Sequence, residues 1–251
     1  MKRIIIALCL IPAWVWAVTF ESDRMEDILS HVDVETWVLI DIDNTLIESS
    51  MHLGSVQWRT HIREKAGDAG YNALESEAIL DKFWLFVQPF IPVRLVDPNA
   101  PAVIQNLQNL KIPVLALTAR DSFELEHTQR QIDSVKVFFS SGFPEKILLP
   151  AAYPALHERG VIYCGENSKG AALVAFFQAT SQIPKKVVFV DDKWEQVQKL
   201  EIELEKLNID FVGVRFSRAD ERVKAFDPAI ADLQWSLLPK IVTDDEALEL
   251  F

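Results

Sequence analysis

The sequence is short of cysteine, of basic residues and of long apolar runs. It has two cysteines, and Cys9 lies in an N-terminal segment that we expect to be removed, so that Cys164 alone would remain. That excludes an intramolecular disulfide. Acidic residues outnumber basic ones by 37 to 25, and this surplus disfavours a nucleic-acid or anionic-membrane binder. After the first 17 residues no segment reaches the length of a transmembrane helix.

Residues 1–17, MKRIIIALCLIPAWVWA, have the layout of a secretory signal peptide. A basic start at Lys2 and Arg3 precedes an uncharged apolar stretch that ends at the small residue Ala17. The apolar stretch is too short to cross a bilayer, and no stop-transfer charges follow it. We therefore expect a cleaved signal, export to the periplasm or beyond the cell, and no stable membrane insertion.

The rest of the chain alternates between strand-like and helix-like segments. Short runs rich in Val, Ile and Phe predict strands at 37–42, 112–117, 136–139, 161–164, 186–190 and 210–216. Helical patterns lie between them at 101–110, 122–132, 169–179 and 194–207. Several strands are apolar on both faces, as a parallel sheet covered by helices requires. The sequence therefore predicts a three-layer, doubly wound α/β fold that binds ligands at the carboxyl ends of its strands.

Two stretches interrupt the alternation. Residues 47–92 are rich in Glu, Ala and aromatic residues and lack a parallel-strand signal, so we interpret them as a small helical cap inserted over the sheet. Residues 18–46 and 93–251 would then form the α/β core. The stretch 141–160 contains three prolines and predicts a small hairpin or a loop.

The stretch VLIDIDNTLIESS, residues 38–50, ends an apolar strand in two carboxylates. Asp41 and Asp43 are two positions apart, so their side chains leave the same face of an extended backbone. A second acidic pair, Asp191 and Asp192, ends the strand KVVFV, and in a parallel sheet it would lie near the first pair. A divalent cation would relieve the repulsion among these groups, and Mg²⁺ prefers carboxylate oxygens together with a substrate phosphate.

Three further residues suit the binding of a phosphate. Thr118 places a hydroxyl at the end of one strand, and Lys169 opens a helix whose N-terminus favours an anion. Arg120 either contacts the substrate or closes the turn after the strand. Taken singly, Thr118 is also compatible with a plain strand-end hydroxyl and Lys169 with a solvated lysine. The acidic pair that ends KVVFV could likewise serve only as a helix cap.

The segments DIDNT, LALT, SKG and FVDD occur in the order of the four motifs of the haloacid dehalogenase-like phosphohydrolases, and residues 35–216 resemble that superfamily in its DxDxT form. The layout looks most like an exported bacterial branch related in outline to periplasmic acid phosphatases. The resemblance implies that Asp41 attacks phosphorus and that Asp43 acts as general acid and base. It implies that Thr118, Arg120 and Lys169 bind the phosphoester.

The resemblance also implies a metal site and a class of substrate. Asp41, the backbone carbonyl of Asp43 and Asp191 would bind Mg²⁺, while Asp192 would bind a metal-bound water or orient Lys169. The substrate would be a phosphomonoester of a small molecule or of a protein. The alternatives are a phosphotransferase or phosphomutase with the same nucleophile, and an exported, non-catalytic binding module on the same fold. The sequence favours no particular oligomeric state.

The five histidines show no metal-ligand spacing, and we expect them in ordinary core or surface positions. Aromatic residues are concentrated in the segment interpreted as the cap. We expect them to pack the cap, and some could grip an apolar leaving group. They are Trp58, Phe83, Trp84, Phe86 and Phe90.

Overall fold

The computed structural model describes residues 16–139 and 142–250, so the predicted signal peptide lies almost wholly outside the described part. An eight-stranded sheet has the order β1-β10-β9-β2-β5-β8-β7-β6. All neighbours from β1 to β8 in this order are parallel, and the last two pairs are antiparallel. The strands are β1 (Ala17–Ser22), β2 (Thr36–Ile40), β5 (Val114–Thr118), β6 (Lys146–Leu148), β7 (Leu156–Glu158), β8 (Val161–Tyr163), β9 (Lys186–Asp191) and β10 (Asp210–Phe216).

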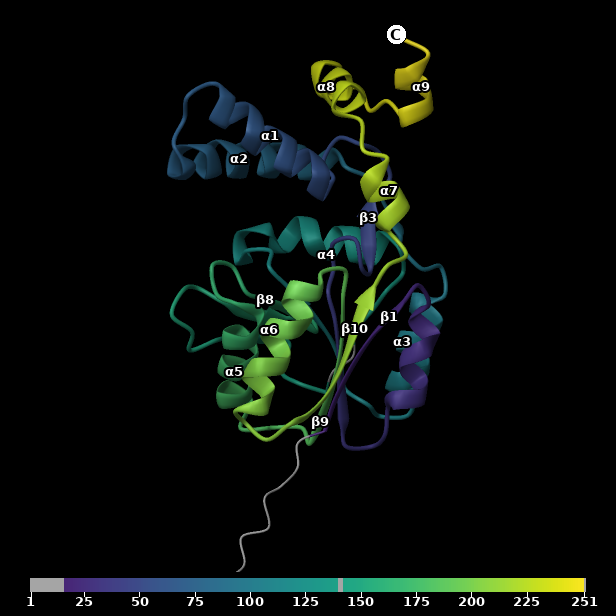
Figure 1. Cartoon of the computed structure of the whole chain (residues 1–251), viewed down its shortest axis with the longest axis vertical. Helices are drawn as coiled ribbons and strands as arrows, with labels where there is room; N and C mark the ends of the chain where they lie inside the picture. Colours follow the sequence, from purple (N-terminus) through teal and green to yellow (C-terminus); the bar gives the residue numbers. More distant parts are fainter. Residues whose placement is uncertain (1–15, 140–141, 251) are drawn as a thin grey trace, which may run out of the picture.

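Helices cover both faces of this sheet (Figure 1). One face carries α5 (Lys169–Thr180) and α6 (Trp194–Glu205). The other carries the 3₁₀ helix η1 (Met25–His31), α3 (Ala100–Asn109) and α4 (Leu125–Ser134), which follows the short 3₁₀ helix η3 (Ser122–Glu124). The residues of β2 alternate between the two cores, because successive side chains of a strand point to opposite faces. The predicted α/β fold is confirmed.

The strand predicted at 136–139 is wrong. Helix α4 ends just before it, and Lys136 has a φ of 59°, a left-handed conformation that closes a helix rather than starting a strand. The N–H of Val137 bonds to the carbonyl of Ile132 at 3.3 Å, and Phe138 is exposed. The apolar run is therefore not a strand. Its residue Val137 packs into the core just after helix α4 ends.

The edges of the sheet add two features. Within 141–160, β6 and β7 form an antiparallel hairpin, which decides between the two forms expected there. At the opposite edge β1 was not predicted. Its alternate residues Val18 and Phe20 are partly covered and the polar Ser22 is buried, while Ala17, Thr19 and Glu21 are exposed. Such an edge strand carries a weak apolar signal.

A second layer lies beyond the carboxyl ends of the strands (Figure 1). Its helical hairpin is formed by α1 (Val56–Asp68) and α2 (Ala73–Val87), followed by the 3₁₀ helix η2 (Gln88–Phe90). The side chain of Ser55 caps α1, and Asn72 with Glu75 forms a capping box on α2. A two-stranded ribbon of β3 (Ile47–Ser49) and β4 (Val93–Leu95) connects the hairpin to the sheet. The hairpin thus lies within the segment interpreted as the cap.

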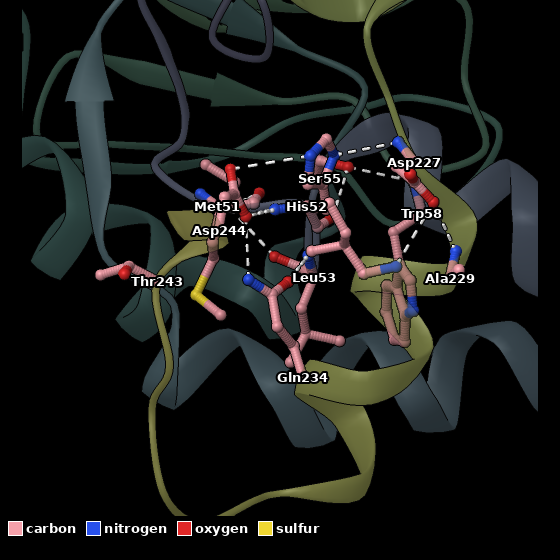
Figure 2. A network of polar contacts seen from close by, with 12 residues as sticks. Met51, His52, Leu53, Ser55, Trp58, Asp227, Ala229, Gln234, Thr243 and Asp244 are labelled. Atoms are coloured by element: carbon pink, nitrogen blue, oxygen red, sulfur yellow. Dashed lines mark hydrogen bonds and ion pairs between the residues drawn. The ribbon is translucent and has the colours of Figure 1, made fainter. Parts of the chain in front are cut away.

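The C-terminal helices join this second layer, although the sequence analysis grouped them with the core. After α7 (Asp220–Lys224), helix α8 (Pro228–Ser236) lies beside the hairpin, and α9 (Asp244–Leu248) packs on the far side of α8 (Figure 1). Figure 2 shows the contact between α8 and the segment that precedes α1. The side chain of Gln234 accepts a hydrogen bond from the backbone N–H of Leu53 at 2.9 Å. Segments far apart in the sequence therefore build one layer. Within the described residues, no helix has both the length and the apolar character needed to cross a bilayer.

Candidate active site

The predicted site residues lie where the order of the central strands changes direction. Asp41 follows β2, Thr118 ends β5 and Asp191 ends β9, while Lys169 begins α5. Strand β2 pairs with both β5 and β9, so these ends are adjacent. The side chains line one pocket of about 120 Å³ together with those of Asp43, Arg120 and Asp192. The site is therefore at a topological switch point of the sheet, where open α/β folds bind their ligands.

Lys169 links the first and last motifs. Its Nζ lies 2.5 Å from Oδ1 of Asp41 and 2.6 Å from Oδ2 of Asp191, and all three side chains are buried. Ser168 caps helix α5 by accepting from the N–H of Ala171, which fixes where Lys169 enters. Burial would lower the pKa of Lys169, but the two carboxylates outweigh it and hold that pKa above its ordinary value. The ammonium group therefore stays charged between them.

Three carboxylates form a cluster that suits a hard cation. Asp41, Asp191 and Asp192 can each offer an oxygen such that the three oxygens lie within 4.8 Å of one another. Burial raises the pKa of Asp41, opposed by the charge of Lys169 and reinforced by the other carboxylates. Burial also raises the pKa of Asp192 to about 6. Three carboxylate oxygens at this separation repel one another, and Mg²⁺ prefers such oxygen ligands and would relieve the repulsion.

The side chain of Asp43 turns away from this cluster and toward Arg120. Arg120 donates from Nε to Asp43 at 2.9 Å and from Nη2 at 2.7 Å. Its Nη1 donates to Thr128 at 3.0 Å and to Gln131 at 2.7 Å. Burial favours the neutral form of Asp43, yet the charge and hydrogen bonds of Arg120 prevail and lower the pKa of Asp43. The guanidinium group of Arg120 thus donates four hydrogen bonds to other side chains. This role is more than the closing of the turn after the strand.

Two threonines complete the core side of the site. The hydroxyl oxygen of Thr118 accepts from the backbone N–H of Arg120 at 3.1 Å, so its proton can be directed at a bound oxyanion. Thr45 was not predicted as a site residue. Its hydroxyl lies 3.4 Å from Oδ2 of Asp41 and accepts from the N–H of Asp192 at 3.0 Å. The sequence feature that could have identified Thr45 is its position as the last residue of the motif DIDNT.

The opposite wall of the pocket comes from the cap. It is formed by Val56 and Arg59 of α1 and Trp84 of α2, while Lys193 and Gln196, at the start of α6, also line the pocket. None of these residues was predicted as part of the site from a motif, because contacts between a cap and a core leave no local pattern. Trp84 had been expected only among the aromatics that pack the cap or grip a leaving group. All five histidines lie outside this lining.

Comparison with known proteins places the chain in a family. The family model described as "Protein of unknown function (DUF2608)" matches residues 21–248. A Chlamydia trachomatis protein named "Putative outer membrane protein" is 25% identical over 226 residues, with 88% of this chain and 84% of that protein covered. A similarly named Chlamydia pneumoniae protein is 23% identical over 258 residues, with 96% and 93% covered.

More distant likenesses were also found. An uncharacterized protein of Rickettsia prowazekii is 22% identical over 262 residues, with 94% of this chain and 93% of that protein covered. Among solved structures, a hydrolase of the haloacid dehalogenase-like family from Streptococcus pneumoniae is 13% identical, with a TM-score of 0.39, and 76% of this chain and 98% of that chain are covered. Because the family model extends over nearly all of the described residues, the chain belongs to the DUF2608 family.

Proposed function

We propose that this chain is an exported, Mg²⁺-dependent phosphatase that hydrolyses a phosphomonoester through a phosphorylated Asp41. The observation that carries the proposal is the convergence of Asp41, Thr118, Lys169 and Asp191 on one pocket, although they come from four separate segments. One ammonium group, that of Lys169, pairs with Asp41 and Asp191, while the cluster holds a third carboxylate, Asp192. A structural ion pair needs only one carboxylate for each ammonium group, so a purely structural role does not account for all three. Phosphoryl transfer uses this set of groups.

In the first step an oxygen of Asp41 would attack phosphorus while the bond to the ester oxygen breaks. Lys169 and the hydroxyl of Thr118 would bind the non-bridging oxygens and offset their charge. Asp43 would give a proton to the departing alcohol, and esters with a stable leaving anion would depend on this proton less. When bound by Asp41, Asp191 and Asp192, Mg²⁺ would supply further neutralisation of the phosphoryl charge.

In the second step water would attack the phosphorylated Asp41, and inorganic phosphate would leave. Asp43 would then accept a proton from that water. The ion pair with Arg120 supports this half of the reaction, because it keeps Asp43 as a carboxylate. The same side chain can serve both halves only if it passes between the protonated and ionised forms.

Export is supported by two observations that are independent of the site. The first is the signal-peptide layout of residues 1–17. The second is that two relatives in Chlamydia carry the name "Putative outer membrane protein", which agrees with export of this chain. An exported phosphatase would act on phosphoesters of the periplasm or of the surroundings of the cell.

The deciding experiment is hydrolysis of 4-nitrophenyl phosphate by the purified mature chain, with and without Mg²⁺. We expect Asp41→Asn to abolish turnover and to leave the circular dichroism spectrum unchanged. The matched control is Asp68→Asn, because Asp68 is an exposed residue at the end of α1. Absence of turnover across a panel of generic phosphoesters would contradict the proposal.

The same preparations separate the proposal from its two alternatives. Transfer of the phosphoryl group to an added sugar or alcohol in preference to water would indicate a phosphotransferase or phosphomutase. Saturable binding of vanadate or beryllofluoride without any turnover would indicate a binding module.

A further inference from the structure

Arg59 is a cationic residue on the cap wall of the pocket, opposite the groups assigned to the phosphoryl group. Lys169 and Thr118 come from the sheet layer, whereas Arg59 belongs to helix α1. A phosphoryl group attacked by Asp41 lies against the sheet layer, so the rest of the substrate must extend toward the cap. Arg59 is therefore placed to meet the leaving group rather than the reacting phosphorus.

The hydrogen bonds of Arg59 leave most of its donors unused. Within the described residues its side chain makes one hydrogen bond, from Nη2 to Asp81 of α2 at 3.1 Å. Its Nε is buried and has no partner in the same part of the chain. Buried donors are nearly always satisfied in native proteins, so an unmatched one in a pocket wall calls for an acceptor. A guanidinium group has five N–H donors arranged to grip a carboxylate or a phosphate.

The orientation of Arg59 is fixed from the core. Its guanidinium carbon lies 5.5 Å from the centre of the Trp84 ring, in a cation–π arrangement. The indole N–H of Trp84 in turn donates to Glu124 at 2.5 Å, and both of these side chains are buried. Glu124 is held by the backbone N–H of Asp121 at 3.0 Å, three residues after Thr118. The cap cation is thus positioned against the same turn that follows the second motif.

The size of the pocket limits what Arg59 can meet. Its volume of about 120 Å³ is well below the roughly 300–1,000 Å³ of pockets for drug-sized ligands. A phosphoryl group and a few further heavy atoms would fill it. In this arrangement the far end of a small leaving group falls beside Arg59 and Trp84.

We infer that Arg59 is a specificity residue that binds a second anionic group on the substrate. The substrate class is a small phosphomonoester whose leaving group carries a carboxylate or a second phosphate. This inference rests on the proposed function, because it takes the phosphoryl position from Asp41. It adds the chemistry of the leaving group, which the motifs do not specify.

The test compares three esters whose leaving groups share a two-carbon skeleton: ethyl phosphate, carboxymethyl phosphate and the bisphosphate of ethylene glycol. We expect the wild-type chain to favour one or both anionic esters by about tenfold or more in kcat/KM. Arg59→Met should lower kcat/KM for the favoured ester at least about tenfold more than for ethyl phosphate, and Arg59→Lys should restore part of the preference. If carboxymethyl phosphate is favoured, the group that Arg59 recognises is a carboxylate. If the bisphosphate is favoured, that group is a phosphate.

The chain offers a closely matched control. Arg63 is one turn further along α1 and pairs with Glu77 of α2, as Arg59 pairs with Asp81, but it does not line the pocket. Arg63→Met should therefore keep the preference. An equal loss for all three esters in Arg59→Met would overturn the inference, because it would place Arg59 on the phosphoryl group. Equal wild-type rates for the three esters would overturn it as well.

Binding separates this inference from the proposed function. Calorimetry on Asp41→Asn measures the affinity for each ester without turnover. A preference for an anionic ester that disappears in the double variant Asp41→Asn, Arg59→Met supports the inference even if the wild-type chain hydrolyses nothing, in which case the proposed function alone fails. The inference would be overturned if each of the two variants bound the three esters with equal affinity. The hydrolysis experiment on the wild-type chain would still test the proposed function separately.

Discussion

Arg120 holds both carboxylate oxygens of Asp43, through Nε at 2.9 Å and Nη2 at 2.7 Å. The pair is the first link of a buried chain that reaches the cap. Arg120 Nη1 donates to Gln131 at 2.7 Å, Gln131 donates to Gln88 at 2.7 Å, and Gln88 donates to the carbonyl of Gly54 at 3.3 Å. Gly54 precedes α1 and Gln88 follows α2. Asp43, the proposed general acid and base, is therefore connected by hydrogen bonds to both ends of the helical hairpin.

We expect Arg120→Lys to lower both stability and activity. A lysine keeps the charge but loses the forked geometry, so an oxygen of Asp43 and the side chain of Gln131 lose their partner. The free energy of unfolding should fall by about 1–3 kcal/mol, and kcat should fall about tenfold or more because Asp43 is less well held. Urea unfolding and hydrolysis of 4-nitrophenyl phosphate measure the two effects.

The control for this change is Arg159→Lys. Arg159 also contacts both oxygens of an aspartate, Asp133, at 3.0 and 3.3 Å, but both side chains are about 40% exposed. A surface pair of this kind contributes about 0–1 kcal/mol, so this variant should unfold almost as the wild type does. Equal losses of stability in the two variants would show that burial of Arg120 has no special effect.

The ends of the strands could be predicted from the sequence because the information is local. An apolar run that stops at Asp41, at Thr118 or at Asp191 shows both the strand and the edge where its last side chain emerges. Parallel pairing then brings these edges together without any knowledge of side-chain contacts. The Asp41 and Lys169 contact follows from this logic, since α5 begins at the same edge.

The cap wall could not be predicted in the same way. Trp84 and Glu124 are 40 positions apart, and neither lies in a motif, so their hydrogen bond depends on how the hairpin docks. The C-terminal helices show the same limit, because Ala231 packs with Trp58 across most of the length of the chain. The strand prediction at 136–139 failed for the opposite reason, because the left-handed conformation of Lys136 overrode a strong local pattern.

Binding of Mg²⁺ should stabilise the folded chain. A ligand that binds only the native state adds about 2.7 kcal/mol when its concentration is a hundred times its Kd. We expect the melting temperature to rise in Mg²⁺ relative to EDTA, and Asp191→Asn to remove this rise. Asp97→Asn is the matched control, because Asp97 is also buried but, among the described residues, its side chain accepts only from the backbone N–H groups of Met25 and Asn99. A rise of the same size in Asp191→Asn would argue against the cluster.

Two buried tryptophans of the cap should respond differently to the same substitution. Trp84 donates to the buried Glu124 at 2.5 Å, whereas the indole N–H of Trp58 is buried and finds no partner among the described residues. Trp84→Phe leaves a buried acceptor unsatisfied, and we expect it to lower the free energy of unfolding by about 1–3 kcal/mol more than Trp58→Phe does. Urea unfolding of both variants measures the difference. A larger loss in Trp58→Phe would mean that packing of the indole outweighs the hydrogen bond.

His157 on β7 should make stability depend on pH. Its ring lies 5.0 Å from that of Phe176, and neither ring nitrogen has a hydrogen-bond partner in the part of the chain described. Burial lowers the pKa of His157 from 6.5 to about 4, with the charge of Glu158 opposing the shift. Between these two pH values the unfolded chain binds the proton and the folded chain does not, so the free energy of unfolding falls as the pH is lowered.

The His157→Phe variant isolates this effect, because a phenyl ring fits an aromatic core and binds no proton. Above pH 7 the difference in unfolding free energy between the variant and the wild type should be constant, which provides an internal control. Between pH 6.5 and about 4 the difference should grow in favour of the variant, approaching about 3 kcal/mol. Below that range it should level off, because both states of the wild type are then protonated. Urea unfolding at a series of pH values measures it, and a difference that does not vary with pH would show that His157 titrates alike in the folded and unfolded chain.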